Sequence, residues 1–295
     1  MLANNIEKVS CLICNSDRFV EFSSGTRHLN IEPPLSVMRC SSCRLLFLNP
    51  RPSANARTQI FAGQKPSGLE SYLFNLANYG SVTKSRKELF SNRVKVLAEK
   101  YFLNGTNVNV LDIGASSGEF MEAVLEFGWV AIGVEPSTSG VTTAKAKGLH
   151  VVQAPAEQLP FPDQSFDLVH SNHVFEHLAD PMAAAKEAYR VLKPGGIVFI
   201  EVPNQFDNIQ FFRYRLMGSV PVRERNIRSI HHLVFFSRKS LRALLHRAGF
   251  ENIVIKDKYG EGRRGLAYLG SLLIRFIGLF YLGAPVIQAI ASKRK

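Results

Sequence analysis

The sequence predicts an α/β protein with a mostly parallel, doubly wound sheet, and three observations carry this prediction. Residues 108–113 form a short β-branched run, which is typical of a buried parallel strand. A glycine-containing turn follows at residues 114–118, and residues 119–127 repeat apolar side chains at helical spacing. A second β-branched run, residues 129–134, ends on the acidic residue Glu135. Strand, turn, helix and strand in this order make half of a nucleotide-binding α/β unit.

The composition allows one or two domains with a sizeable core, because 46% of the 295 residues are hydrophobic. The formal net charge is +12, and residues 201–295 hold 17 Lys and Arg against 6 Asp and Glu. Such an excess suggests an acidic partner (anionic lipid, a phosphorylated substrate or nucleic acid), with a solvated basic surface as the alternative. The N-terminus lacks the charged, apolar and small-residue series of a signal peptide, so we expect a cytoplasmic protein with reduced cysteines.

All four cysteines lie in two Cys-x-x-Cys pairs, Cys11 with Cys14 and Cys40 with Cys43. Thiolates are soft ligands, and two such pairs supply the four ligands of a tetrahedral zinc site. Disulfides and a redox pair are the alternatives, which a reducing compartment and the lack of a βαβ context disfavour. The sequence therefore predicts a structural zinc ribbon over residues 1–50.

The spacing of the glycine turn narrows the choice of nucleotide. A dinucleotide fingerprint needs glycines at its first, third and sixth positions, and the count from Gly114 fails at the last two. The pattern Asp-x-Gly-x-x-x-Gly, residues 112–118, instead resembles the first motif of class I S-adenosylmethionine-dependent methyltransferases. That resemblance implies a Rossmann-like domain, with Asp112 near the methionine part of the cofactor and Glu135 on its ribose hydroxyls. Gly114 and Gly118 are expected to let the backbone turn tightly and approach the ligand.

Two later segments share the same resemblance. Residues 156–170, with a Leu-Pro-Phe run, resemble the segment between the third and fourth strands of ubiquinone-biosynthesis-like methyltransferases, where adenine is contacted. Residues 192–196, Leu-Lys-Pro-Gly-Gly, precede the next strand as they do in that family. The resemblance assigns to S-adenosylmethionine the residues Asp112, Gly114, Ala115, Ser116, Gly118, Glu135, Pro136, Ala156, Glu157 and Asn172.

Two histidines are candidates for the acceptor side of the site. His173 lies in residues 171–178, which follow the fourth strand at the sheet edge where open α/β sheets bind ligands. The same segment spells His-x-x-Glu-His, an inverted zinc-peptidase signature, but in a strand-to-helix loop rather than a helix. His232 lies in residues 231–237, which resemble a motif of deoxysugar C-methyltransferases whose histidine is the proposed base. Either histidine can instead satisfy local hydrogen bonds or cap a helix.

We expect four regions: a zinc ribbon at 1–50, a helical linker or cap at 51–107, a S-adenosylmethionine-binding domain at 108–258 with an insertion at 204–230, and an apolar, basic-flanked helical tail at 259–295. Residues 266–284 of the tail are apolar apart from Arg275 and a few small polar positions. Attachment to the inner face of a membrane, packing against the protein, and a true span are the alternatives. The sequence reveals no convincing seventh, antiparallel strand.

Similar zinc ribbons precede the methyltransferase domain in bacterial enzymes acting on sugars and on cell-surface or secondary metabolites. The resemblance thus implies transfer of a methyl group to a sugar, glycan or lipid-linked precursor, phosphorylated in some forms, with O-methylation favoured. A ubiquinone- or menaquinone-type ring methyltransferase is the alternative within this class. Outside it, the alternative is a nucleic-acid-binding protein with an inactive or RNA-directed domain. Nucleic acid is disfavoured because the basic residues flank an apolar helix rather than an aromatic-studded stripe.

Overall fold

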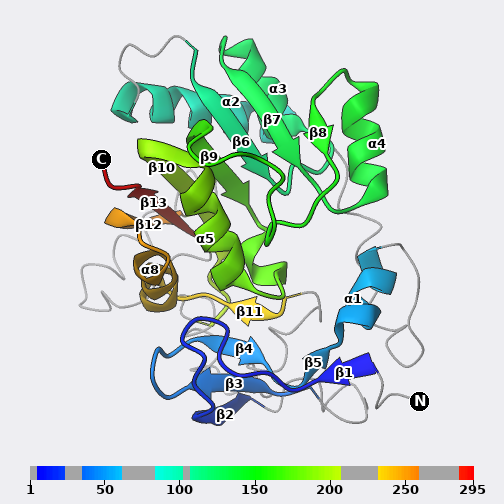
Figure 1. Ribbon diagram of the computed structural model, residues 1–295, viewed down its shortest axis with the longest axis vertical. Helices are drawn as coiled ribbons and strands as arrows, with labels where there is room; N and C mark the ends of the chain where they lie inside the picture. The colour runs from blue at the N-terminus through cyan, green and yellow to red at the C-terminus, as the bar shows by residue number, and fades with distance from the viewer. Residues whose placement is uncertain (1–4, 24–34, 62–83, 102–106, 207–231, 259–285) are drawn as a thin grey trace, which may run out of the picture.

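A seven-stranded sheet of order β12-β13-β10-β9-β6-β7-β8 forms the centre of the protein (Figure 1). The computed structural model describes residues 5–23, 35–61, 84–101, 107–206, 232–258 and 286–295. The strands are β6 (Asn109–Ile113), β7 (Val130–Val134), β8 (Val151–Val152), β9 (Phe166–Asn172), β10 (Leu192–Pro203), β12 (Glu251–Lys258) and β13 (Val286–Ser292). The five strands from β10 to β8 in this order are parallel, and β13 runs antiparallel to both of its neighbours. The predicted α/β fold with a mostly parallel sheet is confirmed.

Helices cover both faces of this sheet. They are α2 (Lys84–Tyr101), α3 (Glu119–Glu126) and α4 (Thr138–Ala146) on one face, and α5 (Pro181–Val191) and α8 (Arg238–Arg247) on the other. Side chains of one strand alternate between the two faces, so Val110 packs with α2 and α3 whereas Leu111 belongs to the cluster of α5 and α8. Ser137 and Asp180 cap α4 and α5, as their positions in the sequence suggest.

The seventh strand lies in the segment that we expected to be a helical tail. Residues 286–292 form β13 between β10 and β12, so the tail assignment at 259–295 is wrong for these residues. Ile287 and Ala289 face one side of the sheet and Ile290 the other, because a strand between two partners is buried on both faces. Such a strand is a continuous apolar run that periodicity cannot separate from a helix. Residues 266–284 lie outside the described residues.

None of the helices in the described part of the chain combines the length and apolar character that a bilayer crossing needs. Of the expected helical linker at 51–107, the structure describes α1 (Ala54–Phe61) and α2, while residues 62–83 are outside the described ranges. The insertion expected at 204–230 is described only over residues 204–206.

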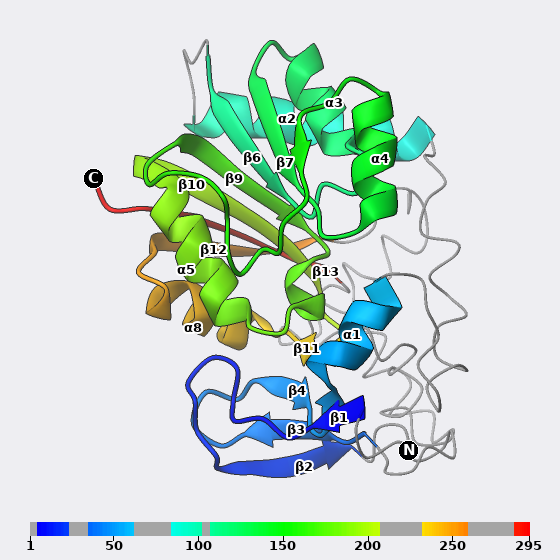
Figure 2. The same ribbon diagram turned by 45° about the vertical axis from the view of Figure 1, so that its right-hand side comes forward.

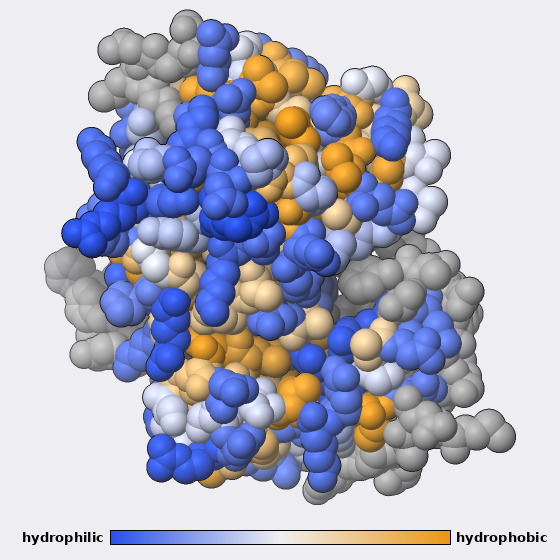
Figure 3. Space-filling view, viewed as in Figure 1, coloured by the Kyte–Doolittle hydropathy of each residue, from blue (hydrophilic) through white to orange (hydrophobic). Residues whose placement is uncertain are grey.

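The N-terminal region forms a second, smaller sheet, in which one strand, β11, comes from the later part of the chain (Figure 2). Its order is β11-β4-β3-β2, made of β2 (Phe19–Ser23), β3 (Val37–Cys40), β4 (Leu46–Leu48) and β11 (Val234–Phe235); β1 (Ile6–Glu7) pairs separately with β5 (Arg51–Pro52). One buried cluster runs from this sheet into the face that carries α5 and α8. Hydrophobic side chains also gather in the seam between the two parts (Figure 3). The N-terminal sheet is therefore packed firmly against the larger sheet.

Candidate functional site

The turn between β6 and α3 is fixed by the neighbouring strand. The amides of Gly114 and Ala115 both donate to the carbonyl oxygen of Val134, over 2.8 and 3.0 Å. Gly114 has a φ of +76°, in the left-handed region, and a Cβ built there would lie 2.2 Å from Cγ2 of Val174. Gly118 has a φ of +86°, and its Cβ would lie 2.1 Å from a methyl carbon of Leu149. The missing Cβ atoms of these two glycines therefore leave room for protein side chains, and the expected approach of their backbone to a ligand stays a prediction.

Glu135 closes the turn from the end of β7. Its Oε2 accepts a hydrogen bond from the Ser116 amide (3.0 Å), and its Oε1 accepts from the amide and hydroxyl of Ser137 (2.9 and 2.6 Å). Ser116 itself has a φ of +50°, a conformation that is uncommon for a residue with a side chain. Glu135 is buried and lies at the carboxyl ends of β6 and β7, where the sequence placed it. Its Oε2 keeps a lone pair for one further donor.

Asp112 is held by a buried histidine that the sequence analysis did not single out. Oδ1 of Asp112 lies 2.7 Å from Nδ1 of His170, and Nε2 of His170 lies 2.9 Å from Nη1 of Arg93. Because a guanidinium only donates, Nε2 accepts, and the ring proton on Nδ1 donates to Asp112. Burial lowers the pKa of His170 well below its usual value, and the charge of Arg93 adds to this, so the ring is neutral. Burial raises the pKa of Asp112 well above its usual value, while the charge of Arg93 opposes the rise.

Arg93 connects α2 to two strands of the sheet, β9 and β10. Besides His170, its guanidinium donates to Oδ1 of Asn172 (2.8 Å) and to Oε2 of Glu201 (2.7 Å). Glu201 also accepts from Nε2 of Gln288 on β13, over 2.6 Å. Arg93 is only 6% exposed, so this is a buried ion pair surrounded by further hydrogen bonds. A signal was present in the sequence, since Arg93 stands among the apolar residues of the buried face of α2.

The two predicted acceptor-side histidines come close to one buried carboxylate, Glu176, in the short 3₁₀ helix Phe175–His177. Nδ1 of His173 lies 3.2 Å from Oε1 of Glu176, and Nε2 of His173 lies 3.8 Å from Oε1 of Glu201. His173 has a φ of +56°, and its amide donates to the Glu201 carbonyl oxygen. Burial alone would lower the pKa of His173, but the hydrogen bond and negative charge of Glu176, helped by Glu201, raise it.

His232, which is distant from Glu176 in the sequence, also lies close to the Glu176 carboxylate. Its ring lies against that of His177, with centroids 4.8 Å apart, and its Nδ1 lies 2.9 Å from Oε1 of Gln205. The amide of Leu233 donates to the Glu176 carbonyl oxygen, over 2.8 Å. Burial by itself would raise the pKa of Glu176, but His173, His177 and His232 outweigh it and hold that pKa at about 2. The structure thus brings His173 and His232 into one cluster.

Three other predicted cofactor residues lie farther along the same edge. Oε1 of Glu157 accepts hydrogen bonds from the amides of Ala179 and Asp180, over 3.2 and 3.4 Å. The carbonyl oxygen of Pro136 accepts from the Gln153 side chain, over 3.1 Å. Ala156 is buried. The carboxylate of Glu157 therefore already serves the connection that leads into α5.

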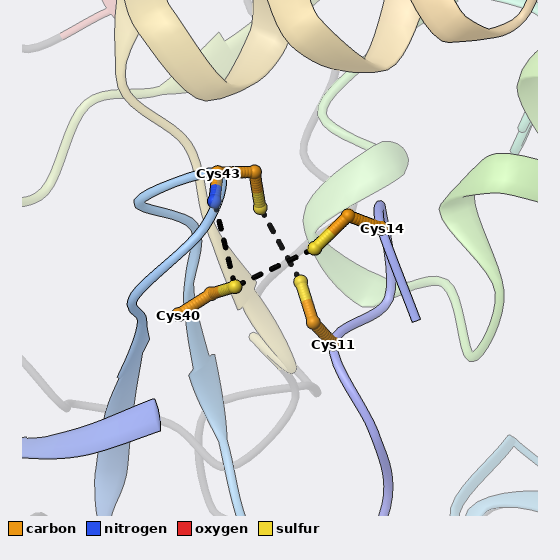
Figure 4. Close-up of side chains that lie close together, drawn as sticks. All are labelled: Cys11, Cys14, Cys40 and Cys43. Atoms are coloured by element: carbon orange, nitrogen blue, oxygen red, sulfur yellow. Dashed lines mark hydrogen bonds between the residues drawn. The ribbon is translucent and has the colours of Figure 1, made fainter. Parts of the chain in front are cut away.

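The four cysteines of the N-terminal sheet meet at one point (Figure 4). Sγ of Cys11 lies 3.4 Å from Sγ of Cys43, Sγ of Cys14 lies 3.5 Å from Sγ of Cys40, and all four sulfurs are within 4.8 Å of one another. All four are free thiols. A tetrahedral ion with Zn–S bonds of about 2.3 Å spaces its sulfurs by about 3.8 Å, so this set fits zinc closely.

The two cysteine loops share one backbone design. The amide of Asn15 donates to the carbonyl of Cys11 and that of Arg44 to the carbonyl of Cys40, over 2.8 and 3.1 Å. Asn15 and Arg44 both have left-handed φ angles, +55° and +66°. Burial raises the pKa of Cys40, but hydrogen bonds from Cys43 and other amides of its loop outweigh it and set that pKa at about 7. The second loop therefore favours the Cys40 thiolate, the form that binds a metal, whereas the hydrogen bond with Cys43 and burial raise the pKa of Cys11 in the first loop.

The open sheet, with acidic residues at the ends of two adjacent parallel strands, is the architecture of nucleotide-binding α/β proteins. A family model described as a methyltransferase domain matches residues 82–255, which is more than half of the chain. The chain therefore belongs to this methyltransferase family. It has the fold of the class I enzymes, which take their methyl group from S-adenosylmethionine.

Relatives of the chain agree with this assignment. It is 27% identical over 179 residues to the ubiquinone biosynthesis O-methyltransferase of Pseudomonas fluorescens, covering 57% of this chain and 73% of that protein. It is 30% identical over 168 residues to the ubiquinone/menaquinone biosynthesis C-methyltransferase of Vibrio vulnificus, covering 48% and 64%. A crystal structure of a S-adenosylmethionine-dependent methyltransferase from Archaeoglobus fulgidus matches with a TM-score of 0.53 and 22% identity, over 76% of this chain and 99% of that one. The last match supports the fold.

Proposed function

We propose that this methyltransferase transfers the methyl group of S-adenosylmethionine to a hydroxyl oxygen of a sugar, glycan or lipid-linked precursor, in the cytoplasm. The observation that carries the choice of an oxygen acceptor is the cluster of His173 and His232 around Glu176. A methyl sulfonium is reactive without covalent help, so a base is needed only where the acceptor must lose a proton. A hydroxyl is such an acceptor, and imidazoles at the sheet edge suit it.

In this proposal the cofactor lies across the ends of β6, β7 and β9. Glu135 offers its remaining lone pair to a ribose hydroxyl, and Asp112 and Asn172 face the methionine part. The backbone of Ala115, Ser116 and Pro136, between the two glycines and Glu135, forms the floor. Ala156 and Glu157 lie on the adenine side. Support comes from the hydrogen bonds that orient Glu135, Asp112 and Asn172 from behind.

The transfer step needs one base. The acceptor oxygen attacks the methyl carbon, the carbon–sulfur bond breaks, and its electron pair stays on sulfur as S-adenosylhomocysteine. The hydroxyl proton passes to a ring nitrogen of His232 or His173. Because Nδ1 of His173 donates to Glu176, its Nε2 is the nitrogen that can accept the proton.

The four cysteines are proposed to bind one structural zinc ion. The sulfur spacing and the thiolate-stabilising loop of Cys40 support this. With four protein ligands the ion would have no open position, so it would stabilise the ribbon rather than take part in the reaction.

The alternative is a ring methyltransferase acting on a ubiquinone or menaquinone precursor, and the names of the two relatives above favour it. A nucleic-acid-binding protein with an inactive or RNA-directed domain remains the alternative of another class. Peripheral attachment to an anionic membrane through residues 266–284 is also proposed. A truncation would remove β13, so the attachment is tested with a variant in which a Gly-Ser linker replaces residues 266–284. Equal partition of wild type and variant between membrane and soluble fractions would refute the attachment.

The proposed reaction is tested with methyl-labelled S-adenosylmethionine and three acceptor panels: nucleotide sugars and lipid-linked sugars, catechol-type rings, and RNA. We expect label in the first panel only, in a product that resists the mild hydrolysis that cleaves esters. Binding of S-adenosylhomocysteine is measured beside it by calorimetry. Label in the ring panel alone would replace the sugar with the alternative acceptor. Absence of S-adenosylhomocysteine binding would remove methyl transfer itself.

A further inference from the structure

We propose that Glu176, His177 and His232 form a second metal site, which binds one divalent transition-metal ion beside the acceptor. One ligand atom from each of these residues lies within 4.8 Å of the other two. Two imidazoles and one carboxylate suit zinc, iron, cobalt or manganese. The site combines two parts of the chain that are distant in sequence: the short 3₁₀ helix after β9, and His232, which lies two residues before β11.

The carboxylate of Glu176 gives the second, independent observation. Glu176 is 1% exposed, yet its Oε2 has no hydrogen-bond partner among the residues that the structure describes. A buried carboxylate oxygen without a partner is costly, so a ligand is expected to satisfy it. Oε1 is already used, because it lies 3.2 Å from Nδ1 of His173. The ion would bind Oε2 of Glu176, for which the described residues provide no hydrogen-bond donor.

Hydrogen bonds behind the site orient its ligands. Oε1 of Gln205 can only accept, so Nδ1 of His232 donates to it, and Nε2 of His232 carries the lone pair. Metal-binding histidines are commonly fixed in this way by a partner of the other ring nitrogen. The Leu233 amide, bonded to the Glu176 carbonyl oxygen, ties the chain next to His232 to the 3₁₀ helix. His177 points its Nε2 at the same carboxylate, 3.9 Å from Oε1 of Glu176.

This site differs from the cysteine site in what it can do. Three protein ligands leave a coordination position open, as in metal sites that handle substrate. Its two histidines are partly exposed, whereas Glu176 is buried behind them. Resting on the proposed function, the ion would bind the acceptor oxygen and make its proton easier to remove. With His232 bound to metal, Nε2 of His173 is left as the proton acceptor.

The experiment measures metal content on the full-length protein with its ribbon intact. Wild type, Glu176→Gln, His177→Asn and the control His246→Asn, an exposed histidine on α8, are incubated with Zn²⁺ and desalted, and zinc per chain is determined by mass spectrometry. We expect two zinc ions per chain in wild type and His246→Asn, and one in the other two variants. Gln205→Ala should weaken the second ion about 10- to 100-fold, because it removes only an orienting partner.

Cobalt separates the two sites in the same proteins. A ribbon-bound cobalt ion gives thiolate charge-transfer absorption, and the second ion adds d–d bands without it. Circular dichroism confirms that each variant is folded, and His177→Asn, at a partly exposed position, replaces Glu176→Gln if that variant does not fold. One metal ion per chain in folded wild type, or unchanged content in His177→Asn, would overturn the site. If wild type holds two metal ions per chain but does not bind S-adenosylhomocysteine, that result would count against the proposed function and not against the metal site.

Discussion

Replacing Gly114 with alanine tests how the glycine turn is built. The φ of +76° costs a residue with a Cβ about 1–2 kcal/mol. The new Cβ would also lie 2.2 Å from Cγ2 of Val174, with Cγ1 and Cβ of the same valine at 3.3 and 3.4 Å. Valine has few alternative rotamers, so the connection after β9 must shift, and overpacking of this kind costs about 1–3 kcal/mol. Gly114→Ala should therefore lower the free energy of unfolding by about 2–5 kcal/mol.

The chain offers a matched control for each part of this cost. Gly148 has nearly the same φ, +77°, but nothing lies within 4 Å of its added Cβ, so Gly148→Ala should lose only the backbone part, about 1–2 kcal/mol. Val174→Ala removes the two methyl groups that collide. In that background Gly114→Ala should cost no more than Gly148→Ala, which gives a coupling energy of about 1–3 kcal/mol.

Urea denaturation of wild type, the three single variants and the double variant supplies these free energies, and calorimetry with S-adenosylhomocysteine measures binding of the cofactor analogue. Equal losses in Gly114→Ala and Gly148→Ala, with no coupling to Val174, would refute the packing explanation. If Gly114→Ala with Val174→Ala regains the expected stability and still fails to bind the cofactor analogue, the glycine also serves the ligand directly.

Three further changes follow from the same structure. Arg93→Met should cost about 3–5 kcal/mol in urea denaturation because it removes the guanidinium that is ion-paired with the buried carboxylate of Glu201. Lys87→Met, at an exposed ion pair, should change the free energy of unfolding little, and equal effects of the two substitutions would contradict the buried network. Glu135→Gln should weaken S-adenosylhomocysteine binding about 10- to 100-fold in calorimetry, and unchanged affinity would exclude Glu135 from the ribose site. Removing the proposed zinc ion of the four cysteines with a chelator should lower the melting temperature of the whole chain, since both sheets share one buried cluster. A separate transition at low temperature would show that the two sheets unfold independently.

Strands β6 and β7 could be predicted because each is a short run rich in β-branched residues beside a helix and a glycine or polar turn. β13 could not, because its apolar run continues a longer apolar segment and carries no alternation. Its position is set by two partners far away in the sequence, β10 and β12. Register and pairing of that kind are tertiary choices, which local pattern does not contain.

The candidate site shows the same division. Asp112, Glu135 and the four cysteines are visible in the sequence because motif spacing places them at strand ends or in paired loops. His170 is not, since it looks like an isolated polar residue in a buried strand until the fold brings it against Asp112 and Arg93. Likewise the sequence His-x-x-Glu-His contains only Glu176 and His177 of the proposed second metal site, and the third proposed ligand, His232, comes from a separate segment.

Two backbone hydrogen bonds connect the N-terminal sheet, through Leu233 beside His232, to the 3₁₀ helix that carries Glu176. The Leu48 amide donates to the Leu233 carbonyl oxygen, and the Leu233 amide donates to Glu176, over 2.9 and 2.8 Å. β11 adds ladder pairing to β4, so the chain carrying His232 is held on one side by the ribbon and on the other by the 3₁₀ helix. The turn at Gly114 is fixed instead by β7. Disturbing the ribbon should therefore displace the acceptor side first, while the cofactor side keeps its own support within the larger sheet.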